Sequence, residues 1–269
     1  MTDASADPSQ PLPELDTTVP HSARVWNYWL GGKDNYEPDR MVGDQVRAMF
    51  PDITRLAVAD RAFLGRAVRY LAGEAGIRQF LDVGTGLPTA DNTHQVAQAI
   101  APASRIVYVD NDPLVLVHAR ALLTSTPEGA CDYLDADLRD TGTILTRAAQ
   151  TLDFGQPVAL MLFGIVGQIP DSAQPESVIK QLMDPLPSGS YLALSDGVNT
   201  SATFTDAVQH YNENSANTYH PRSPQQLTGF FDGLDLVPPG VVELTRWRPE
   251  PGAIEQRDVP GMGGVGRKP

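Results

Sequence analysis

The chain has 269 residues, and 41% of them are hydrophobic, which is enough to bury a sizeable core in one large domain or two small ones. It carries 33 acidic and 20 basic residues, a formal charge of -13, which argues against non-specific binding to nucleic acid or to an anionic membrane surface. The single cysteine, Cys131, excludes an intramolecular disulfide, and no apolar run approaches the roughly 20 residues of a membrane span, so we expect a soluble cytoplasmic protein.

The first part of the chain divides into a polar leader and a helical segment. Residues 1–20 are acidic and rich in proline, and we expect them to be disordered because they offer little apolar surface. Residues 21–76 predict a lid made of three helices. Ser22 is placed to cap the first helix, and the pair Gly31 and Gly32 is typical of a helix end.

From residue 77 the pattern changes to short apolar runs that alternate with amphipathic windows. The runs predict strands at 79–84, 105–110, 131–137, 158–164 and 189–196. The windows predict helices at 92–101, 113–124, 141–150 and 175–183. Such alternation indicates β-α-β units and a mostly parallel sheet with helices on both faces, and we expect this domain to span residues 77–250.

The end of the chain breaks this rhythm. Residues 234–248 contain two β-rich runs joined by Pro238, Pro239 and Gly240, a link that is too short for a crossover helix. The two runs are therefore predicted to be antiparallel neighbours. We expect residues 251–269 to be a flexible tail.

Ligands of an open parallel sheet bind beyond the carboxyl ends of its strands, and the first expected strand leads into "DVGTGLPT". Gly84 and Gly86, on either side of Thr85, allow a tight turn and a close approach of ligand to bare backbone. Asp82 is expected to organise the turn and to meet an amino group of the ligand. The alternative is that the two glycines form a strand-to-helix turn with no ligand.

Acidic residues also follow the next two expected strands. Asp110 lies 24 residues after Gly86, where a carboxylate accepts both hydroxyls of a ribose, and Asn111 is expected beside the same ligand. After the third strand, Asp137 is placed to meet an adenine amino group, and the Leu138 N–H to meet a ring nitrogen. The alternatives are that Asp110 caps the next helix and that Asp137 is a solvated carboxylate.

Three histidines are candidates for a general base, which a phenol or an amine would need as a nucleophile. His94 follows the glycine turn, and its alternative role is in the core. His210 and His220 flank the polar segment "YNENSANTY", where solvated side chains are the alternative. We expect no metal ion.

The turn Gly84-x-Gly86-x-Pro88-Thr89 lacks the third glycine of a dinucleotide-binding fingerprint, and a second acidic position follows the third strand. With the closing strand pair, these features resemble the seven-stranded, Rossmann-like S-adenosylmethionine-dependent methyltransferases. The stretches "ARVWNYWLGGKDNYEPDR", "LDVGTGLPTADNTHQVAQ", "VYVDNDPLVLVHARALL" and "FFDGLDLVPPGVVELTRWRP" are similar to one bacterial family of S-adenosyl methyltransferases, long known as a domain of unknown function.

The resemblance implies an α/β fold whose sheet is mostly parallel with an antiparallel C-terminal pair, and S-adenosylmethionine as the cofactor. It implies no particular substrate. We expect in-line methyl transfer to a small molecule. Two alternatives stay open: a non-catalytic protein that binds S-adenosylmethionine or S-adenosylhomocysteine, and a nicotinamide-dependent oxidoreductase. The oligomeric state is not predicted.

The stretch "ARVWNYWLGGKDNYEPDR" precedes the expected sheet and is predicted to be the part of the lid that touches the cofactor. Two glycines beside polar residues suit a ligand-facing loop, so Gly32, Lys33 and Asn35 are expected at the cofactor, with Lys33 at its carboxylate. Trp26 and Trp29 are expected to pack in the core, because large aromatic residues at helical spacing are usually core residues.

Overall fold

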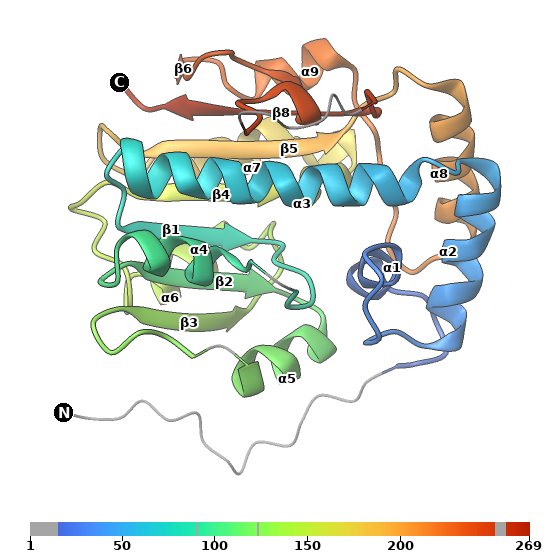
Figure 1. Cartoon of the computed structure of the whole chain (residues 1–269), viewed down its shortest axis with the longest axis horizontal. Helices are drawn as coiled ribbons and strands as arrows, with labels where there is room; N and C mark the ends of the chain where they lie inside the picture. The colour runs from blue at the N-terminus through green and yellow to red at the C-terminus, as the bar shows by residue number, and fades with distance from the viewer. Residues whose placement is uncertain (1–15, 90, 123, 251–256) are drawn as a thin grey trace.

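The computed structural model describes residues 16–89, 91–122, 124–250 and 257–269. Within these residues an eight-stranded sheet forms the centre of the molecule, in the order β3-β2-β1-β4-β5-β8-β6, with β7 paired to β8 (Figure 1). The strands are β1 (Gln79–Val83), β2 (Arg105–Asp110), β3 (Ala130–Asp135), β4 (Ala159–Phe163), β5 (Tyr191–Gly197), β6 (Asp235–Leu236), β7 (Val242–Glu243) and β8 (Gly261–Arg267). Strands β1 to β5 are parallel, which confirms the predicted α/β class. Most of the predicted leader, residues 1–15, lies outside the described residues.

The helices that follow the parallel strands lie where the amphipathic windows predict them. They are α4 (Thr93–Ile100), α5 (Pro113–Leu122), α6 (Thr141–Ala148) and α7 (Pro175–Met183). The other helices are α1 (Ser22–Trp29), α2 (Glu37–Met49), α3 (Ile53–Arg69), the π-helical turn η1 (Tyr70–Glu74), α8 (Ala202–Asn214) and α9 (Pro224–Gly229). Short 3-10 turns are η2 (Val166–Gln168), η3 (Asp171–Ala173) and η4 (Leu244–Arg246).

Alternate residues of the central strands pack on opposite faces of the sheet, because successive side chains of a strand point in opposite directions. Phe80 of β1 and Met161 of β4 join the core beneath α3 and α4. Leu81 and Leu160 join a second core on the other face, with α6, α7 and α9. All residues of β1, β4 and β5 are buried, as expected for a parallel sheet that is covered on both sides.

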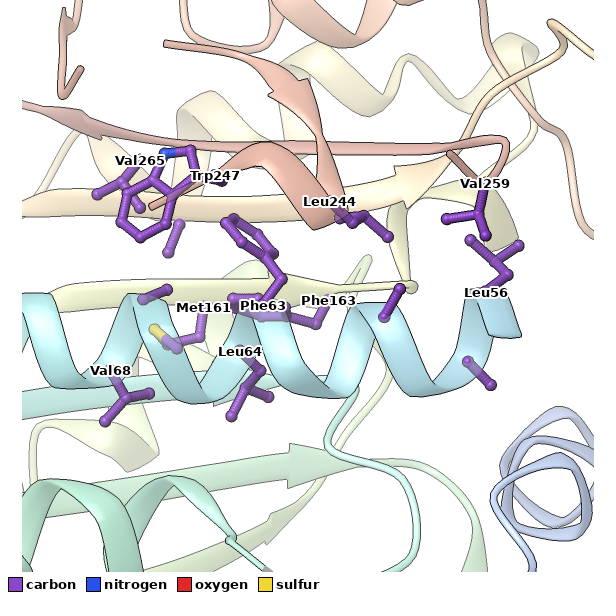
Figure 2. Close-up of a cluster of buried hydrophobic side chains, with 14 of the residues drawn as sticks. Leu56, Phe63, Leu64, Val68, Met161, Phe163, Leu244, Trp247, Val259 and Val265 are labelled. Carbon is purple, nitrogen blue, oxygen red and sulfur yellow. The ribbon is translucent and has the colours of Figure 1, made fainter. Parts of the chain in front are cut away.

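Helix α3 is one layer of the sheet domain. It runs across the face formed by β4, β5 and β8, and Phe63, Leu64 and Val68 point from it towards the strands (Figure 2). The Phe63 and Trp247 rings pack edge to face with centroids 5.3 Å apart, and both side chains are fully buried. The predicted lid over residues 21–76 is therefore too long, and only α1 and α2 lie outside this layer.

The C-terminal strands differ from the sequence prediction. Strands β6 and β7 do not pair with each other; both pair antiparallel with β8, which lies between β5 and β6. The prediction of a flexible tail is wrong for residues 261–267, while residues 251–256 lie outside the described part. Glycine dominates β8 and usually weakens a strand, which hid it from the sequence analysis. A Cβ at Gly263 would lie 2.6 Å from the Phe63 ring, so close packing on α3 requires glycine there.

Helices α1, α2 and α8 gather at the edge of the sheet to which the parallel strands point (Figure 1). Contacts with polar side chains hold α1 in place. Its Arg24 guanidinium lies 3.3 Å from Asp39 of α2, with both side chains buried, and the Trp29 Nε1–H donates to the Gly43 carbonyl at 3.1 Å. These helices therefore form a cover over the carboxyl ends of the strands.

Candidate active site

A cavity of about 150 Å³ lies between the carboxyl ends of the parallel strands and the cover. One part of its wall comes from the ends of β1, β2, β4 and β5 and the loops that follow them, and it includes Asp82, Gly84, Thr85, Gly86, Asp110, Asn111, Gly164 and Asp196. The other part is mostly apolar and comes from α1, α2, α3 and α8, and it includes Trp26, Trp29, Leu30, Val46, Leu56, Phe204 and Val208. The same cavity thus has a polar side and an apolar side.

The predicted glycine turn lies on the polar side, and its two glycines have different roles. Both have positive φ angles, +77° at Gly84 and +65° at Gly86, which only glycine adopts readily. A Cβ at Gly84 would lie 2.3 Å from Ile165, so the close packing of a side chain from the β4 loop requires glycine there. No atom lies within 4 Å of the Cβ position at Gly86, which leaves that backbone open to the cavity.

The structure brings Asp82, Asp110 and Asn111 to the turn, as the sequence predicts. Oδ2 of Asp110 accepts the Gly86 N–H at 2.7 Å, and its Oδ1 accepts the Asp112 N–H at 3.0 Å. Oδ2 of Asp82 accepts the Thr93 hydroxyl at 2.6 Å. Burial raises the pKa of Asp110, and it raises the pKa of Asp82 to about 6 although the Thr93 hydrogen bond lowers it. Two buried carboxyl groups, at the ends of the neighbouring strands β1 and β2, therefore lie at the turn.

Asp137 and Leu138 are not among the cavity-lining residues. Strand β3 ends at Asp135, earlier than predicted, and the Asp137 carboxylate accepts the Arg139 Nε–H at 2.8 Å. This hydrogen bond lowers the pKa of Asp137. Leu138 is buried in the core beside α6. Their contact with adenine stays a prediction that the geometry of the cavity does not support.

The loop of residues 31–35 is also absent from the cavity wall. The buried Asn27 side chain organises it: its Oδ1 accepts the Asn35 Nδ2–H at 3.0 Å, and a Cβ at Gly32 would lie 2.3 Å from its Nδ2. Lys33 is exposed. The cover instead reaches the cavity through the helix face that carries Asn27, Trp26 and Leu30.

None of the three candidate histidines belongs to the described cavity wall. His94 is buried behind it, where its backbone N–H donates to the Tyr108 hydroxyl at 2.7 Å, and burial lowers its pKa. His210 lies 3.1 Å from the Gln45 side chain, and His220 lies 3.0 Å from the Thr218 hydroxyl. The structure therefore assigns these side chains to packing and to local hydrogen bonds.

Two acids that the sequence analysis missed face the cavity instead. Oδ1 of Asp60, on α3, accepts the Ser195 hydroxyl at the end of β5. The next residue, Asp196, accepts the Tyr219 hydroxyl and the Gly167 N–H, the latter at 2.6 Å. Burial raises the pKa of Asp60 to about 7 and that of Asp196 to about 6, although the hydrogen bonds from Ser195 and Tyr219 lower them. Both groups thus titrate near neutral pH.

A pattern in the sequence points to each of these two acids, Asp60 and Asp196. Asp60 lies four residues from both Leu56 and Leu64, on the apolar face of an amphipathic helix where an acid is out of place. Asp196 ends the fifth predicted strand, at the same kind of position as Asp82 and Asp110. The rule about strand ends would have found Asp196 if it had been applied to every strand.

Arg61 is a further residue of interest, since it is the sole cationic side chain of the cavity wall as far as the structure describes it. Its Nη2–H donates to Asn92 at 3.1 Å. Burial lowers its pKa, while Asp82 and Asp60 raise it, so the guanidinium lies in the field of both acids. It is the side chain placed to meet a carboxylate, the role that the sequence analysis gave to Lys33.

Comparison of the sequence with known families agrees with the fold and the cavity described above. The model of the S-adenosyl methyltransferase family matches residues 8–269. The chain belongs to this family. It is an S-adenosylmethionine-dependent methyltransferase, and the family decides against the nicotinamide-dependent oxidoreductase that the sequence left open. No curated protein matches this methyltransferase.

Solved structures agree with this assignment. A DUF574 family protein from Streptomyces avermitilis is 42% identical, with a TM-score of 0.91 over 95% of this chain and 100% of that chain. A protein from Thermobifida fusca, provisionally named a methyltransferase, is 40% identical, with a TM-score of 0.88 over 97% of this chain and 99% of that chain. A SAM-dependent methyltransferase from Anabaena variabilis shares the fold alone, at 11% identity and a TM-score of 0.51 over 76% of this chain and 84% of that chain.

The cavity of this methyltransferase fits the cofactor. The open backbone at Gly86 leaves space beside the Asp110 carboxylate, the group that a ribose requires. The acid at Asp82 matches the positive charge of an ammonium, and Arg61 matches a carboxylate. Within the described ranges, no group of three or more His, Cys, Asp or Glu side chains is arranged to hold a metal ion, and no helix has the length and apolar character needed to span a membrane.

Proposed function

We propose that this methyltransferase acts on a small molecule that enters the cavity from the apolar side. The observation that carries the proposal is that one cavity is lined both by Gly86 and Asp110 and by buried apolar residues such as Phe204 and Leu56. Pockets for small molecules are typically apolar with a few polar groups that fix orientation. Walls from several helices around the apolar side favour a small acceptor over a segment of a macromolecule.

The strand-end residues are proposed to hold the cofactor. Asp110 would accept the ribose hydroxyls, the Gly86 backbone would lie against the ligand, and Asn111 would line the same part of the site. Asp82 and Arg61 carry the charges that complement an amino group and a carboxylate. The bound cofactor supplies a methyl group on a positively charged sulfur, which is already activated for displacement. The chain itself then has to position the acceptor and to exclude water.

The cover supports that second task. Helices α1, α2 and α8 pack together, and Val46 and Val208 of α2 and α8 close the apolar side of the cavity. We propose that α1 and α2 act as a lid, because a ligand of this cavity has to pass them or the loop after α8. Removal of residues 21–40 is expected to weaken binding of the cofactor while the sheet stays folded.

The experiment uses the purified full chain. Isothermal titration calorimetry with S-adenosylhomocysteine and with NAD tests which cofactor binds. Denaturation with and without ligand is a second measurement, because a ligand at 100 times its dissociation constant should raise the free energy of unfolding by about 2.7 kcal/mol. An extract of cells that make the protein, split by ultrafiltration, then tests the acceptor. We expect S-adenosylhomocysteine to form with the small-molecule fraction; formation only with the macromolecular fraction contradicts the proposal.

We also propose that the enzyme works in a reducing compartment such as the cytoplasm. The support is that Cys131, the chain's one cysteine, is a free thiol on β3. Burial raises its pKa to about 11, so it stays a protonated, unreactive group. Fractionation of cells that make the protein, followed by detection with an antibody, tests this location.

A further inference from the structure

We propose that the methyl acceptor is a small amine with an apolar body, and that Asp60 binds its nitrogen and takes its proton. This inference rests on the proposed function, and it adds the chemical class of the acceptor and a catalytic residue. Three independent features of the cavity carry it: the apolar wall, the balance of charges and the hydrogen bonding of the two buried acids.

The apolar wall selects the body of the acceptor. Buried side chains from five different elements face the cavity on this side: Trp29, Val46, Leu56, Phe163, Phe204 and Val208. Such a wall desolvates whatever it contacts, so it favours a ring or a branched hydrocarbon and disfavours a sugar or a polar chain. The acceptor's reacting group must then lie at the boundary with the polar side.

The charges at that boundary select the reacting group. Asp60 and Asp196 face the cavity there, and Asp82 and Asp110 follow on the polar side, against one guanidinium, that of Arg61. A carboxylate or phenolate acceptor would meet this excess of acids and be repelled, whereas an ammonium would be attracted. The charge balance therefore favours an amine over an acid.

Hydrogen bonding distinguishes Asp60 from Asp196. Asp196 accepts three hydrogen bonds, from the Tyr219 hydroxyl and the Gly197 N–H at Oδ1 and from the Gly167 N–H at Oδ2. Asp60 uses Oδ1 for the Ser195 hydroxyl, and within the described residues its Oδ2 accepts no hydrogen bond. A Cβ at Gly164 would lie 4.0 Å from that oxygen, and glycine leaves the space in front of it open. Oδ2 of Asp60 is thus the place for an N–H donor.

The reaction balances with Asp60 as the base. An acceptor that enters as an ammonium gives one proton to the Asp60 carboxylate and becomes a neutral amine. Its nitrogen lone pair then forms the bond to the methyl carbon, while the sulfur–carbon bond breaks and leaves its electron pair on sulfur. The products are an N-methylammonium and S-adenosylhomocysteine, and Asp60 finally releases its proton to water. A pKa of about 7, raised by burial and by the nearby Asp196 charge, suits a group that takes and gives a proton near neutral pH.

The test compares three probes that share a 2-phenylethyl group: 2-phenylethylamine, 2-phenylethanol and 3-phenylpropanoate. Each is titrated into the full chain that is saturated with S-adenosylhomocysteine, and methyl transfer from S-adenosylmethionine is followed by mass spectrometry. We expect the amine to bind roughly tenfold or more tightly than the alcohol and the acid, and to be the probe that is methylated. Equal or tighter binding of the alcohol or the acid, or no response to the amine, overturns the inference.

The variant Asp60→Asn tests the residue, and Asp206→Asn, which changes an exposed acid on α8 outside the cavity wall, is the matched control. We expect Asp60→Asn to keep its affinity for S-adenosylhomocysteine and to lose the preference for the amine together with kcat. Unchanged amine affinity and kcat overturn the role of Asp60. Failure of wild-type protein to bind S-adenosylhomocysteine would instead refute the proposed function. If Asp60→Asn does not fold, the selectivity of the wild-type protein among the three probes decides whether the acceptor is an amine.

Discussion

Nδ1 of His21, at the start of α1, lies 2.8 Å from Oδ2 of Asp112, which is two residues beyond Asp110. The contact ties the cover to the loop that presents the proposed ribose ligand. Burial would raise the pKa of Asp112, but the hydrogen bond with His21 and the nearby His21 and Arg24 charges outweigh it, and the pKa is lowered. The contact therefore joins the cover to the loop after β2.

His21→Ala is expected to loosen α1 and to weaken S-adenosylhomocysteine binding roughly tenfold, because a hydrogen bond to a charged group contributes about 1.5 to 3 kcal/mol. Hydrogen exchange of residues 21–30 and calorimetry measure the two effects. His210→Ala is the control, since that side chain contacts Gln45 away from the cavity. Unaltered exchange in α1 would show that the contact does not hold the cover.

Asp110→Ala is expected to reduce cofactor affinity by about two to four orders of magnitude, because it removes the charged hydrogen bonds to both ribose hydroxyls, at about 1.5 to 3 kcal/mol each. It also removes the acceptor of the Gly86 N–H, so the turn itself is disturbed. Asp110→Asn keeps the size of the side chain and removes its charge, so it distinguishes the effect of the lost charge from the effect of a changed shape. Calorimetry with S-adenosylhomocysteine measures both variants, and full affinity in both refutes the ribose assignment.

Gly84→Ala is expected to destabilise the fold more than Gly86→Ala. Both changes force a side chain into a positive φ, at about 1 to 2 kcal/mol. At Gly84 the new Cβ also meets Ile165, and such overpacking costs about 1 to 3 kcal/mol more. Urea denaturation measures the difference, and adding Ile165→Gly, which also removes the Cβ that lies 2.6 Å from the new side chain, should recover part of the loss in Gly84→Ala alone. Equal losses in the two single variants would contradict this account.

The buried acids predict that the cofactor-free protein loses stability as pH rises. The pKa of Asp60 is raised from 3.8 to about 7, so between these values the folded state binds more protons than the unfolded state. The free energy of unfolding then falls with rising pH, by up to about 1.4 kcal/mol per pH unit for one such group. Asp82 and Asp196, each with a pKa of about 6, act in the same direction.

Urea denaturation at about pH 5 and about pH 8 measures this fall, and Asp60→Asn should reduce it because the amide does not titrate. The groups that act on Asp60 are Asp196 on β5, which raises its pKa, and Arg61 on α3, which lowers it. Asp206→Asn should leave the slope unchanged. A stability that is as pH-dependent in Asp60→Asn as in the wild-type protein would show that Asp60 is not the group responsible.

Removal of residues 257–269 is expected to unfold the antiparallel side of the sheet and to make the protein aggregate, because β5, β6 and β7 all pair with β8. Circular dichroism and size-exclusion chromatography measure the result. The loss also exposes Trp247 and Phe63, which are fully buried. A monomeric, cooperatively folding truncated chain would contradict the central position of β8.

The parallel half of the fold could be predicted from the sequence because its signals are local. Strands at 105–110 and the helix at 175–183 lie where periodicity places them, and the caps and turns between them are short. Strand β8 could not be predicted in this way. Its glycines have meaning only next to Phe63 and Leu194, which approach from distant parts of the chain.

The polar side of the site was predictable for the same reason, since Asp82, Gly86 and Asp110 follow strands in a known order. The contacts of the cover could not be predicted. The packing of α1 against α2 decides which face of α1 meets the cavity, and the sequence does not show that packing. The composition of residues 31–35, rich in Gly, Lys and Asn, suggests a loop that binds a ligand. In the structure this loop instead forms a hydrogen bond with the buried Asn27 side chain. The histidines were expected from their places after the glycine turn and beside a polar segment, whereas burial raises the pKa values of Asp60 and Asp196 on the cavity wall.

The place of β8 in the sheet also fixes an order of assembly during synthesis. Strands β6 and β7 leave the ribosome before β8, and they pair with β8 and not with each other. The parallel strands β1 to β5 have their partners earlier, so this half can form while the chain is being made. Until residues 261–267 emerge, the nascent sheet carries an open edge at β5, an edge that invites pairing with neighbouring chains.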